Sequence, residues 1–314
     1  MKKIAPLYDG IKLNCTIVSD THIDIKNPTP WIPRGYLKGA LKDSQNSLSP
    51  VDAFITVGDT TSRGQKVNWE MAKSCFDKFT PAKHICLTVG NHDLWHDNDF
   101  DAAIVEFYKY SELISGRKLT TPYFSEVING YHFIFLGNDA ESGCAAHIGD
   151  EQFEWFKDEM AKGGESGKPI FVFCHQSLNQ KHGLPRTWDR HEKPDRPLDE
   201  GGIGERSEEI EDVLKSYKNV FYFSGHSHMG LGGENCKKNE GYSTIEQEGS
   251  LTLVNLPCLS GRNHHGETPS MGIGFQLEAY EDKVILRPRH YLKHQWNTKI
   301  SMQNGKPYYV VDIK

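Results

Sequence analysis

The chain has 314 residues, with 36 Lys and Arg against 42 Asp and Glu and a hydrophobic fraction of 37%. This composition is that of a globular protein and excludes a collagen-like or disordered chain. The net charge of −6 provides no overall positive field toward nucleic acid or an anionic membrane, so nucleic acid is not expected as a partner. If the protein binds a phosphate group, the positive charge that holds it must therefore come from a local site.

Short apolar runs alternate with segments of helical spacing over the first two thirds of the chain, which is typical of a layered α/β fold. Buried strands are predicted over residues 13–19, 53–57, 84–89, 131–136, 170–174 and 220–224. Helices are predicted over residues 35–47, 66–79, 99–114, 150–162 and 206–217.

From about residue 241 the pattern changes to strands without a convincing helix. These strands are predicted over residues 250–255, 273–280, 284–289 and 308–312, with a hairpin turn at Glu281-Asp282. We expect this last part to form antiparallel sheet. No linker or internal repeat interrupts the chain, so a single domain over 1–314 is predicted, with a loop insert at about 178–205 and C-terminal strands from about 241.

The seven cysteines are scattered and include no C-x-x-C pair. This usage fits reduced thiols better than a disulfide scaffold. The first residues lack the apolar run of a signal peptide, and no apolar stretch is long enough to cross a membrane. We therefore expect a cytoplasmic protein without a membrane partner.

Polar clusters follow five of the predicted strands at the point where each strand ends. They comprise Asp20 and His22, Asp59, Asn91 with His92 and Asp93, His175, and His226 with His228. Taken alone, each of these clusters has a purely structural explanation, as a turn residue, a helix cap or a buried histidine with its hydrogen bonds made. Because the carboxyl ends of strands are where open α/β sheets bind ligands, five such clusters are expected to converge on one site.

In order, these clusters read D-x-H, G-D, G-N-H-D, a lone His and G-H-x-H. In this the chain resembles the calcineurin-like metallophosphoesterases, over about residues 13–290. The resemblance implies a four-layer α/β/β/α sandwich of two mixed β-sheets flanked by helices. It also implies two metal ions, one held by Asp20, His22 and His228, the other by Asn91, His175 and His226, with Asp59 bridging them.

Imidazole and oxygen ligands suit Mn²⁺, Fe²⁺ or Fe³⁺, Zn²⁺ or Co²⁺, and the sequence leaves the choice among these metals open. Two divalent ions against two carboxylates leave a formal charge of about +2, which attracts a phosphate. A metal-bridging hydroxide can then attack phosphorus in line. The resemblance implies that His92 either protonates the leaving oxygen or stabilises the transition state, and we expect Asp93 to orient His92 through its second ring nitrogen.

Residues on the substrate side are less defined by the sequence. Arg63 lies in G-D-T-T-S-R-G, which resembles a block of the protein Ser/Thr phosphatase branch except that Ser62 replaces its Asp. Arg63 and Arg262 are candidate phosphate ligands, with exposed surface arginine as the alternative. A candidate substrate rim comprises Arg186, Arg190, His191, Arg196, His264 and His265, and candidate aromatic stacking residues are Trp95, His96 and Trp188.

The favoured function is a phosphodiesterase acting on small phosphate esters or nucleotides. A phosphomonoesterase and a protein Ser/Thr phosphatase remain alternatives within the enzyme class. A non-catalytic, metal-binding interaction scaffold is the alternative from another class, because a fold by itself does not establish activity. The complete ligand set, together with His92, favours the enzyme.

Overall fold

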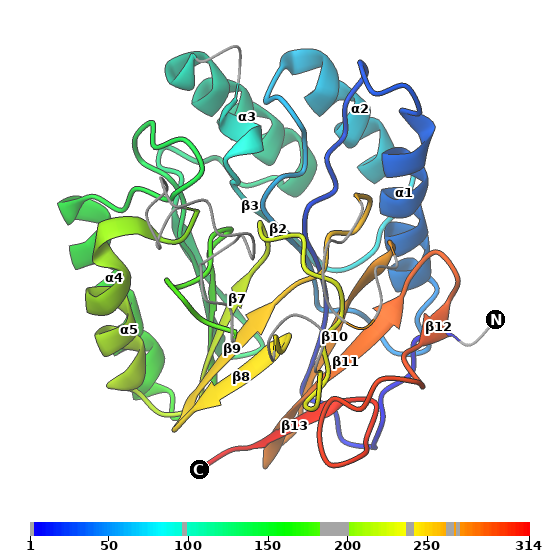
Figure 1. The fold of residues 1–314 in the computed structure, drawn as a ribbon, viewed down its shortest axis with the longest axis vertical. Coiled ribbons are helices and arrows are strands. Elements are labelled where there is room, and N and C mark those ends of the chain that lie inside the picture. The colour runs from blue at the N-terminus through cyan, green and yellow to red at the C-terminus, as the bar shows by residue number, and fades with distance from the viewer. Residues whose placement is uncertain (1–2, 96–98, 183–200, 237–241, 262–266, 268–270) are drawn as a thin grey trace.

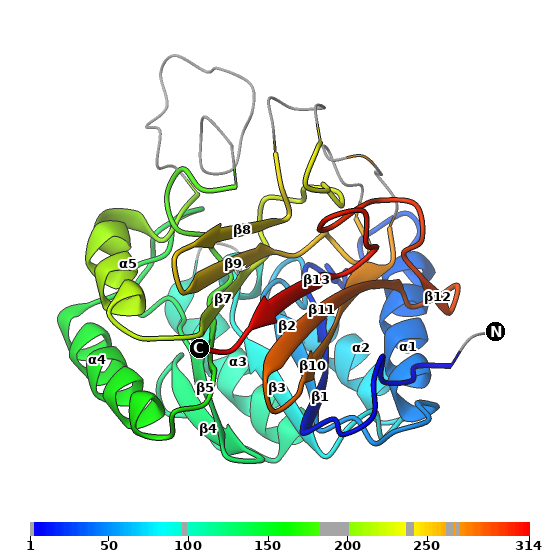
Figure 2. The same cartoon turned by 90° about the horizontal axis from the view of Figure 1, so that it is seen from below.

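The computed structural model describes residues 3–95, 99–182, 201–236, 242–261, 267 and 271–314. Two β-sheets pack face to face, and helices cover both outer surfaces (Figures 1 and 2). This arrangement is the predicted four-layer sandwich. None of the helices in the described part of the chain has the length and apolar character needed to cross a membrane.

The first sheet has seven strands and contains the beginning and the end of the chain. In spatial order it consists of β12 (Gln295–Trp296), β11 (Lys283–His290), β10 (Ile273–Ala279), β1 (Leu13–Val18), β2 (Ala53–Val57) and β3 (His84–Thr88), with β13 (Tyr309–Asp312) also paired to β11. β1, β2 and β3 are parallel, whereas β10 pairs antiparallel with both β1 and β11. The sheet is therefore mixed, with its parallel half next to the helices that connect those strands.

The second sheet has six strands. In spatial order it consists of β4 (Phe124–Ile128), β5 (Tyr131–Phe135), β6 (Ile170–Phe173), β7 (Val220–Ser224), β9 (Leu251–Asn255) and β8 (Ile245–Glu248). The four central strands are parallel and the two edge strands pair antiparallel. Since β9 pairs parallel with β7, the expectation of a purely antiparallel C-terminal part is wrong for this strand.

The helices divide between the two outer surfaces. α1 (Trp31–Gln45), α2 (Lys66–Phe76) and α3 (Phe100–Ser115) cover the first sheet, and α4 (Asp150–Glu165) and α5 (Ser207–Lys215) cover the second (Figure 1). Short 3₁₀ turns occupy His92–Leu94 and Gly204–Arg206. All five predicted helices are present, and the largest error is at α1, which begins four residues before its predicted start because Pro33 fits the first helical turn.

The core between the sheets contains a row of phenylalanines from successive strands of the second sheet. Phe135 and Phe173 have ring centroids 4.9 Å apart, and Phe173 and Phe223 lie 5.0 Å apart. The alternate residues of the same strands, such as Val172 and Tyr222, belong to a second apolar cluster under α4 and α5. Burial on both faces explains why these strands appear in the sequence as continuous apolar runs.

Candidate metal centre and active site

The polar clusters from the two sheets meet at one end of the sandwich. Backbone hydrogen bonds join the loops within the first sheet, with Asp20 N–H donating to Gly58 O at 3.2 Å and His22 N–H donating to Asp59 O at 2.9 Å. Between the sheets, His226 N–H donates to the Asp20 carboxylate at 3.1 Å. The structure thus brings Asp20, His22, Asp59 and His226 into one cluster.

The backbone carries unusual conformations at this cluster. Five of the predicted ligands have a left-handed φ between 48° and 65°: Asp20, His22, Asp59, His226 and His228. Non-glycine residues rarely adopt this region, and such residues concentrate at functional sites where the surrounding structure enforces them. The strand-end loops therefore hold these side chains in strained, fixed directions.

Two glycines allow the loops to approach this closely. A Cβ at Gly58, where φ is +78°, would lie 2.2 Å from His175 Nδ1. A Cβ at Gly90 would lie 2.2 Å from Asp59 Oδ1. Both distances are far inside van der Waals contact, so the sequence requires glycine at these positions for packing against the site.

One group of donor atoms gathers around Asp20. His228 Nε2 lies 3.1 Å from Asp20 Oδ1 and 2.9 Å from His22 Nε2, and His22 Nε2 lies 3.7 Å from the same carboxylate oxygen. Two imidazole nitrogens and a carboxylate oxygen at these separations can share one cation. Their side chains are 15% exposed for His22 and 22% for His228, so the site is open to solvent on this side.

A second group gathers deeper in the protein around His175, whose side chain is fully buried. His175 Nε2 lies 3.1 Å from Asp59 Oδ2, and the donor atoms of Asp59, His175 and His226 all lie within 4.8 Å of one another. Asn91 Oδ1 is buried and makes no hydrogen bond within the described residues. A buried amide oxygen in that state suits a cation as its partner.

Asp59 belongs to both groups. Its Oδ1 accepts a hydrogen bond from His92 N–H at 2.9 Å. Its Oδ2 lies 3.1 Å from His175 Nε2 on one side and 3.6 Å from His22 Nε2 on the other. One oxygen is therefore fixed by the backbone, while the other lies where two neighbouring cations can share it.

The tautomer of His175 follows from its partner. Its Nδ1–H donates to Val57 O at 2.8 Å, and a carbonyl can only accept. Nε2 is thereby aimed at the cluster, which is the usual orientation of a metal-binding histidine. This bond also crosses between the sheets, from the end of β6 to the end of β2.

The ionisable groups of the cluster strongly affect one another. Burial by itself raises the pKa of Asp20, but His228 and His175 outweigh burial and hold that pKa well below its usual range. The same opposition, with His175 foremost, lowers the pKa of Asp59. For His175, burial lowers the pKa, but Asp59 and Asp20 outweigh it and raise the pKa to about 9. Burial lowers the pKa of His226 to about 3. Both carboxylates are thus ionised at neutral pH and suited to bind cations.

The predicted role of Asp93 in orienting His92 is wrong. His92 Nδ1–H donates instead to Ser62 O at 3.0 Å. The Asp93 carboxylate is fully buried and accepts four hydrogen bonds, from Thr60 N, Thr61 N, Thr61 Oγ1 and Gly90 N, at 2.8–3.2 Å. A carboxylate surrounded by four donors ties the loops after β2 and β3 together and leaves the imidazole to another acceptor.

Of the candidate residues on the substrate side, the structure describes only Arg63 and Trp95. Arg63 follows Ser62, whose carbonyl contacts His92, but its Nε pairs with Asp24 Oδ2 at 3.2 Å and its side chain is 41% exposed. Trp95 contacts His92, with ring centroids 5.2 Å apart. Arg262 lies outside the described residues, as do His96, Trp188 and the predicted rim at Arg186, Arg190, His191, Arg196, His264 and His265. Most of the predicted insert at 178–205 also falls outside them.

Cys258 is a neighbour of the cluster that the sequence analysis missed. Its Sγ lies within 4.8 Å of the donor nitrogens of His22 and His228, donates to Asp20 O at 3.1 Å and accepts from Gly261 N at 3.0 Å. It comes three residues after β9, a strand predicted correctly. The strand-end rule applied to that strand would have found it.

Comparison with known proteins agrees with this architecture. The family model of the calcineurin-like phosphoesterases matches residues 13–230, whereas the search of curated proteins found no match. A dimetal phosphatase from Danio rerio superposes with a TM-score of 0.57 at 11% identity, covering 97% of this chain and 100% of that one. A conserved uncharacterised protein from Streptococcus pneumoniae, described as a predicted phosphoesterase, superposes with a TM-score of 0.42 at 10% identity, covering 96% and 97%. The family model spans most of the sequence and includes every predicted ligand, and we conclude that this metal-dependent hydrolase belongs to the calcineurin-like phosphoesterase family.

Proposed function

We propose that the protein is a phosphodiesterase that acts on small phosphate esters or nucleotides. The family uses a binuclear divalent metal centre. In this chain Asp20, His22 and His228 would hold one ion and Asn91, His175 and His226 the other, with Asp59 Oδ2 shared. The observation that carries the proposal is this position of Asp59 Oδ2 between the two groups of donors.

Two divalent ions, when bound, activate water as a nucleophile and stabilise the charge that develops on the oxygens around phosphorus. Hydrolysis forms one P–O bond from the oxygen of water and breaks the P–O bond to the leaving alcohol. The proton that water loses is balanced by the proton that the leaving oxygen gains. The mixture of imidazole and oxygen donors suits Mn²⁺, Fe, Zn²⁺ or Co²⁺.

His92 is the residue that we assign to protonation of the leaving oxygen. Its ring lies 4.8 Å from the ring of His22 but is not itself one of the ligands. Because Nδ1–H donates to Ser62 O, it is Nε2–H of the protonated imidazole that can give its proton to the leaving oxygen, which leaves His92 neutral. Ser62 O therefore positions His92 in the way that the sequence analysis expected of Asp93.

Preference for a diester is supported by the environment of Arg63. A phosphomonoester carries one more negative charge than a diester, and an arginine fork is a common partner for it. The Nε of Arg63 donates to Asp24 Oδ2 at 3.2 Å, so this carboxylate offsets part of the charge that the guanidinium could offer to a phosphate. The alternatives, a phosphomonoesterase or a protein Ser/Thr phosphatase, would have Arg63 bind the phosphate through the Nη1 and Nη2 edge of its guanidinium, with Nε still paired to Asp24.

The test compares methyl 4-nitrophenyl phosphate with 4-nitrophenyl phosphate, using protein stripped of metal and reloaded with Mn²⁺. A ratio of kcat/KM well above one, diester over monoester, is expected. A ratio well below one would overturn the diester preference. Metal-free protein serves as the control for contaminating phosphatases, and no hydrolysis of either ester by the two-metal form would favour the interaction scaffold instead.

A further inference from the structure

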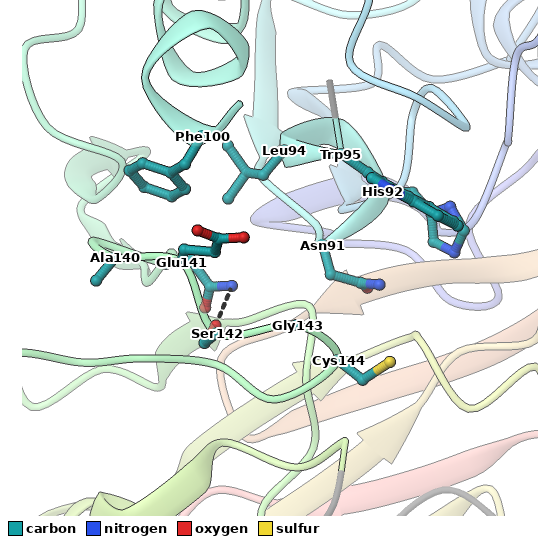
Figure 3. A pocket seen from close by; sticks show the side chains of 11 residues that line it. Asn91, His92, Leu94, Trp95, Phe100, Ala140, Glu141, Ser142, Gly143 and Cys144 are labelled. Atoms are coloured by element: carbon teal, nitrogen blue, oxygen red, sulfur yellow. Dashed lines mark hydrogen bonds between the residues drawn. The ribbon is translucent and has the colours of Figure 1, made fainter. Parts of the chain in front are cut away.

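A pocket of about 270 Å³ adjoins the metal centre at Asn91 and His92. It shares Asn91 and His92 with the site, and its walls come from the turn after β3, the start of α3 and the loop after β5 (Figure 3). Leu94, Trp95 and Phe100 form one wall. The pocket is smaller than the ~300–1,000 Å³ typical of drug-sized ligands, yet larger than the ~150 Å³ that holds benzene in an engineered cavity. Its size suits one substituted ring or a short branched chain.

The wall opposite Trp95 is fixed by its own hydrogen bonds. Asn138 Nδ2 donates to Ser142 Oγ at 3.0 Å, and Asn138 Oδ1 accepts from His147 N at 2.9 Å. Gln176, which follows His175, donates to Cys144 O at 3.2 Å. The loop is thus tied both to itself and to the strand end that supplies a candidate ligand, so the pocket is formed before any substrate arrives.

The charge of the pocket selects against anions. No Lys or Arg is among the described residues that line it, whereas the Glu141 carboxylate lies between the loop and the wall made by Leu94 and Phe100 (Figure 3). A second phosphate or a carboxylate on the bound group would face a like charge next to apolar side chains. The metal centre therefore favours a negatively charged group, whereas this pocket disfavours one.

We propose that this pocket binds the leaving alcohol of the substrate and selects an apolar group without negative charge. The inference rests on the proposed function, because it takes His92 as the donor of the proton to the leaving oxygen. The ring of His92 contacts both the candidate ligand His22 and the pocket residue Trp95, with centroid distances of 4.8 Å and 5.2 Å. Because Trp95 lies next to His92, a group attached to the oxygen that His92 protonates would be within reach of the Trp95 wall.

The test uses two methyl aryl phosphodiesters whose leaving phenols have closely similar acidity, the 3-tert-butylphenyl and the 3-(carboxymethyl)phenyl esters. For the Mn²⁺-loaded protein we expect kcat/KM to favour the tert-butyl ester by at least about tenfold, as for one apolar group in a fitted pocket. Trp95→Ala should remove most of this preference. Glu141→Gln should raise kcat/KM for the carboxymethyl ester by about twofold to fivefold, because the charge that is lost is exposed and screened by solvent.

Matched controls separate the pocket from general effects. Trp31→Ala removes a tryptophan that is 64% exposed at the start of α1, and Glu154→Gln neutralises an exposed carboxylate on α4. Both should leave the ratio between the two esters unchanged. Equal kcat/KM for the two esters, or a preference that survives Trp95→Ala, would overturn the inference while leaving the phosphodiesterase proposal intact.

A binding measurement keeps the two proposals distinguishable. Metal-free protein should bind 3-tert-butylphenol, detected by saturation-transfer NMR, and Trp95→Ala should weaken this binding by about tenfold. If neither ester is hydrolysed, the proposed function fails, and the phenol titration still decides whether the pocket takes an apolar ring. Should Trp95→Ala fail to fold, the kcat/KM of Glu141→Gln for the carboxymethyl ester, compared with that of the native protein, decides whether the leaving group lies in this pocket.

Discussion

Asp93→Asn tests whether this carboxylate holds the loops together or acts on His92. In the native protein Oδ1 accepts from Thr61 N and Thr61 Oγ1, and Oδ2 accepts from Thr60 N and Gly90 N. An asparagine can keep the oxygen on the Thr61 side, but its NH₂ group then faces two buried N–H donors. Each buried donor that loses its acceptor costs about 1–3 kcal/mol, so we expect a loss of roughly 2–6 kcal/mol in the free energy of unfolding.

The assay is denaturant unfolding of metal-free protein, with Asp158→Asn on the exposed face of α4 as control. The control should stay within about 0.5 kcal/mol of the native protein. Burial and the nearby Asp59 raise the pKa of Asp93 to about 7, against the opposing hydrogen bonds from Thr61 and Gly90, so the measurement is made at pH 8. A stability change below about 1 kcal/mol combined with a large fall in kcat would refute the loop-clamping role and restore the original expectation for His92.

Three further predictions concern the metal centre and the response to acid. Asp59→Asn should remove the shared ligand charge, and metal analysis after dialysis should find fewer than two ions per chain; two retained ions would contradict the bridging role. His92→Ala should retain both metals and lower kcat by roughly 10²–10⁴, whereas a change confined to KM would argue against proton transfer. Burial lowers the pKa of His182 to about 4, below the value near 6.5 of an unfolded chain. Between these values the unfolded chain binds a proton that the native protein excludes, so stability is full above pH 6.5 and falls toward pH 4, by at most about 3 kcal/mol. As the pH is lowered from 7 to 4.5, the denaturant midpoint should fall less steeply for His182→Asn than for the native protein, and identical slopes would count against this assignment.

Much of the fold was predictable because the central strands are buried on both faces. β5, β6 and β7 appear in the sequence as continuous apolar runs, and their predicted ends differ from the structure by no more than one residue. The missed strands β4 and β8 lie at the edges of their sheet and contain exposed or charged residues, such as Val127, which is 60% exposed. Edge strands of this kind lack the periodicity on which the prediction depends.

The sequence predicts which residues gather around the metal centre. It predicts their hydrogen-bond partners less well. Strand ends locate Asp20, Asp59 and His175 without any three-dimensional information. The error at Asp93 arose because a carboxylate is a usual partner for the second ring nitrogen of a catalytic histidine, whereas here four backbone and hydroxyl donors, from Thr60, Thr61 and Gly90, occupy the carboxylate. Which donors surround a buried group depends on long-range packing, and a single sequence does not contain that information.

The bonds that cross between the sheets give the metal centre a role beyond chemistry. His226 and Asp20 are 206 residues apart in the chain, and His175 reaches Val57 across 118 residues. Ions bound among these loops would act as a non-covalent cross-link between parts of the chain that are 206 and 118 residues apart. Because the unfolded chain does not present these donors together, ions that bind only the native protein would stabilise it by mass action, with about 2.7 kcal/mol at a free concentration 100 times Kd. Metal supply would then control the resistance of the whole sandwich to unfolding as well as its turnover.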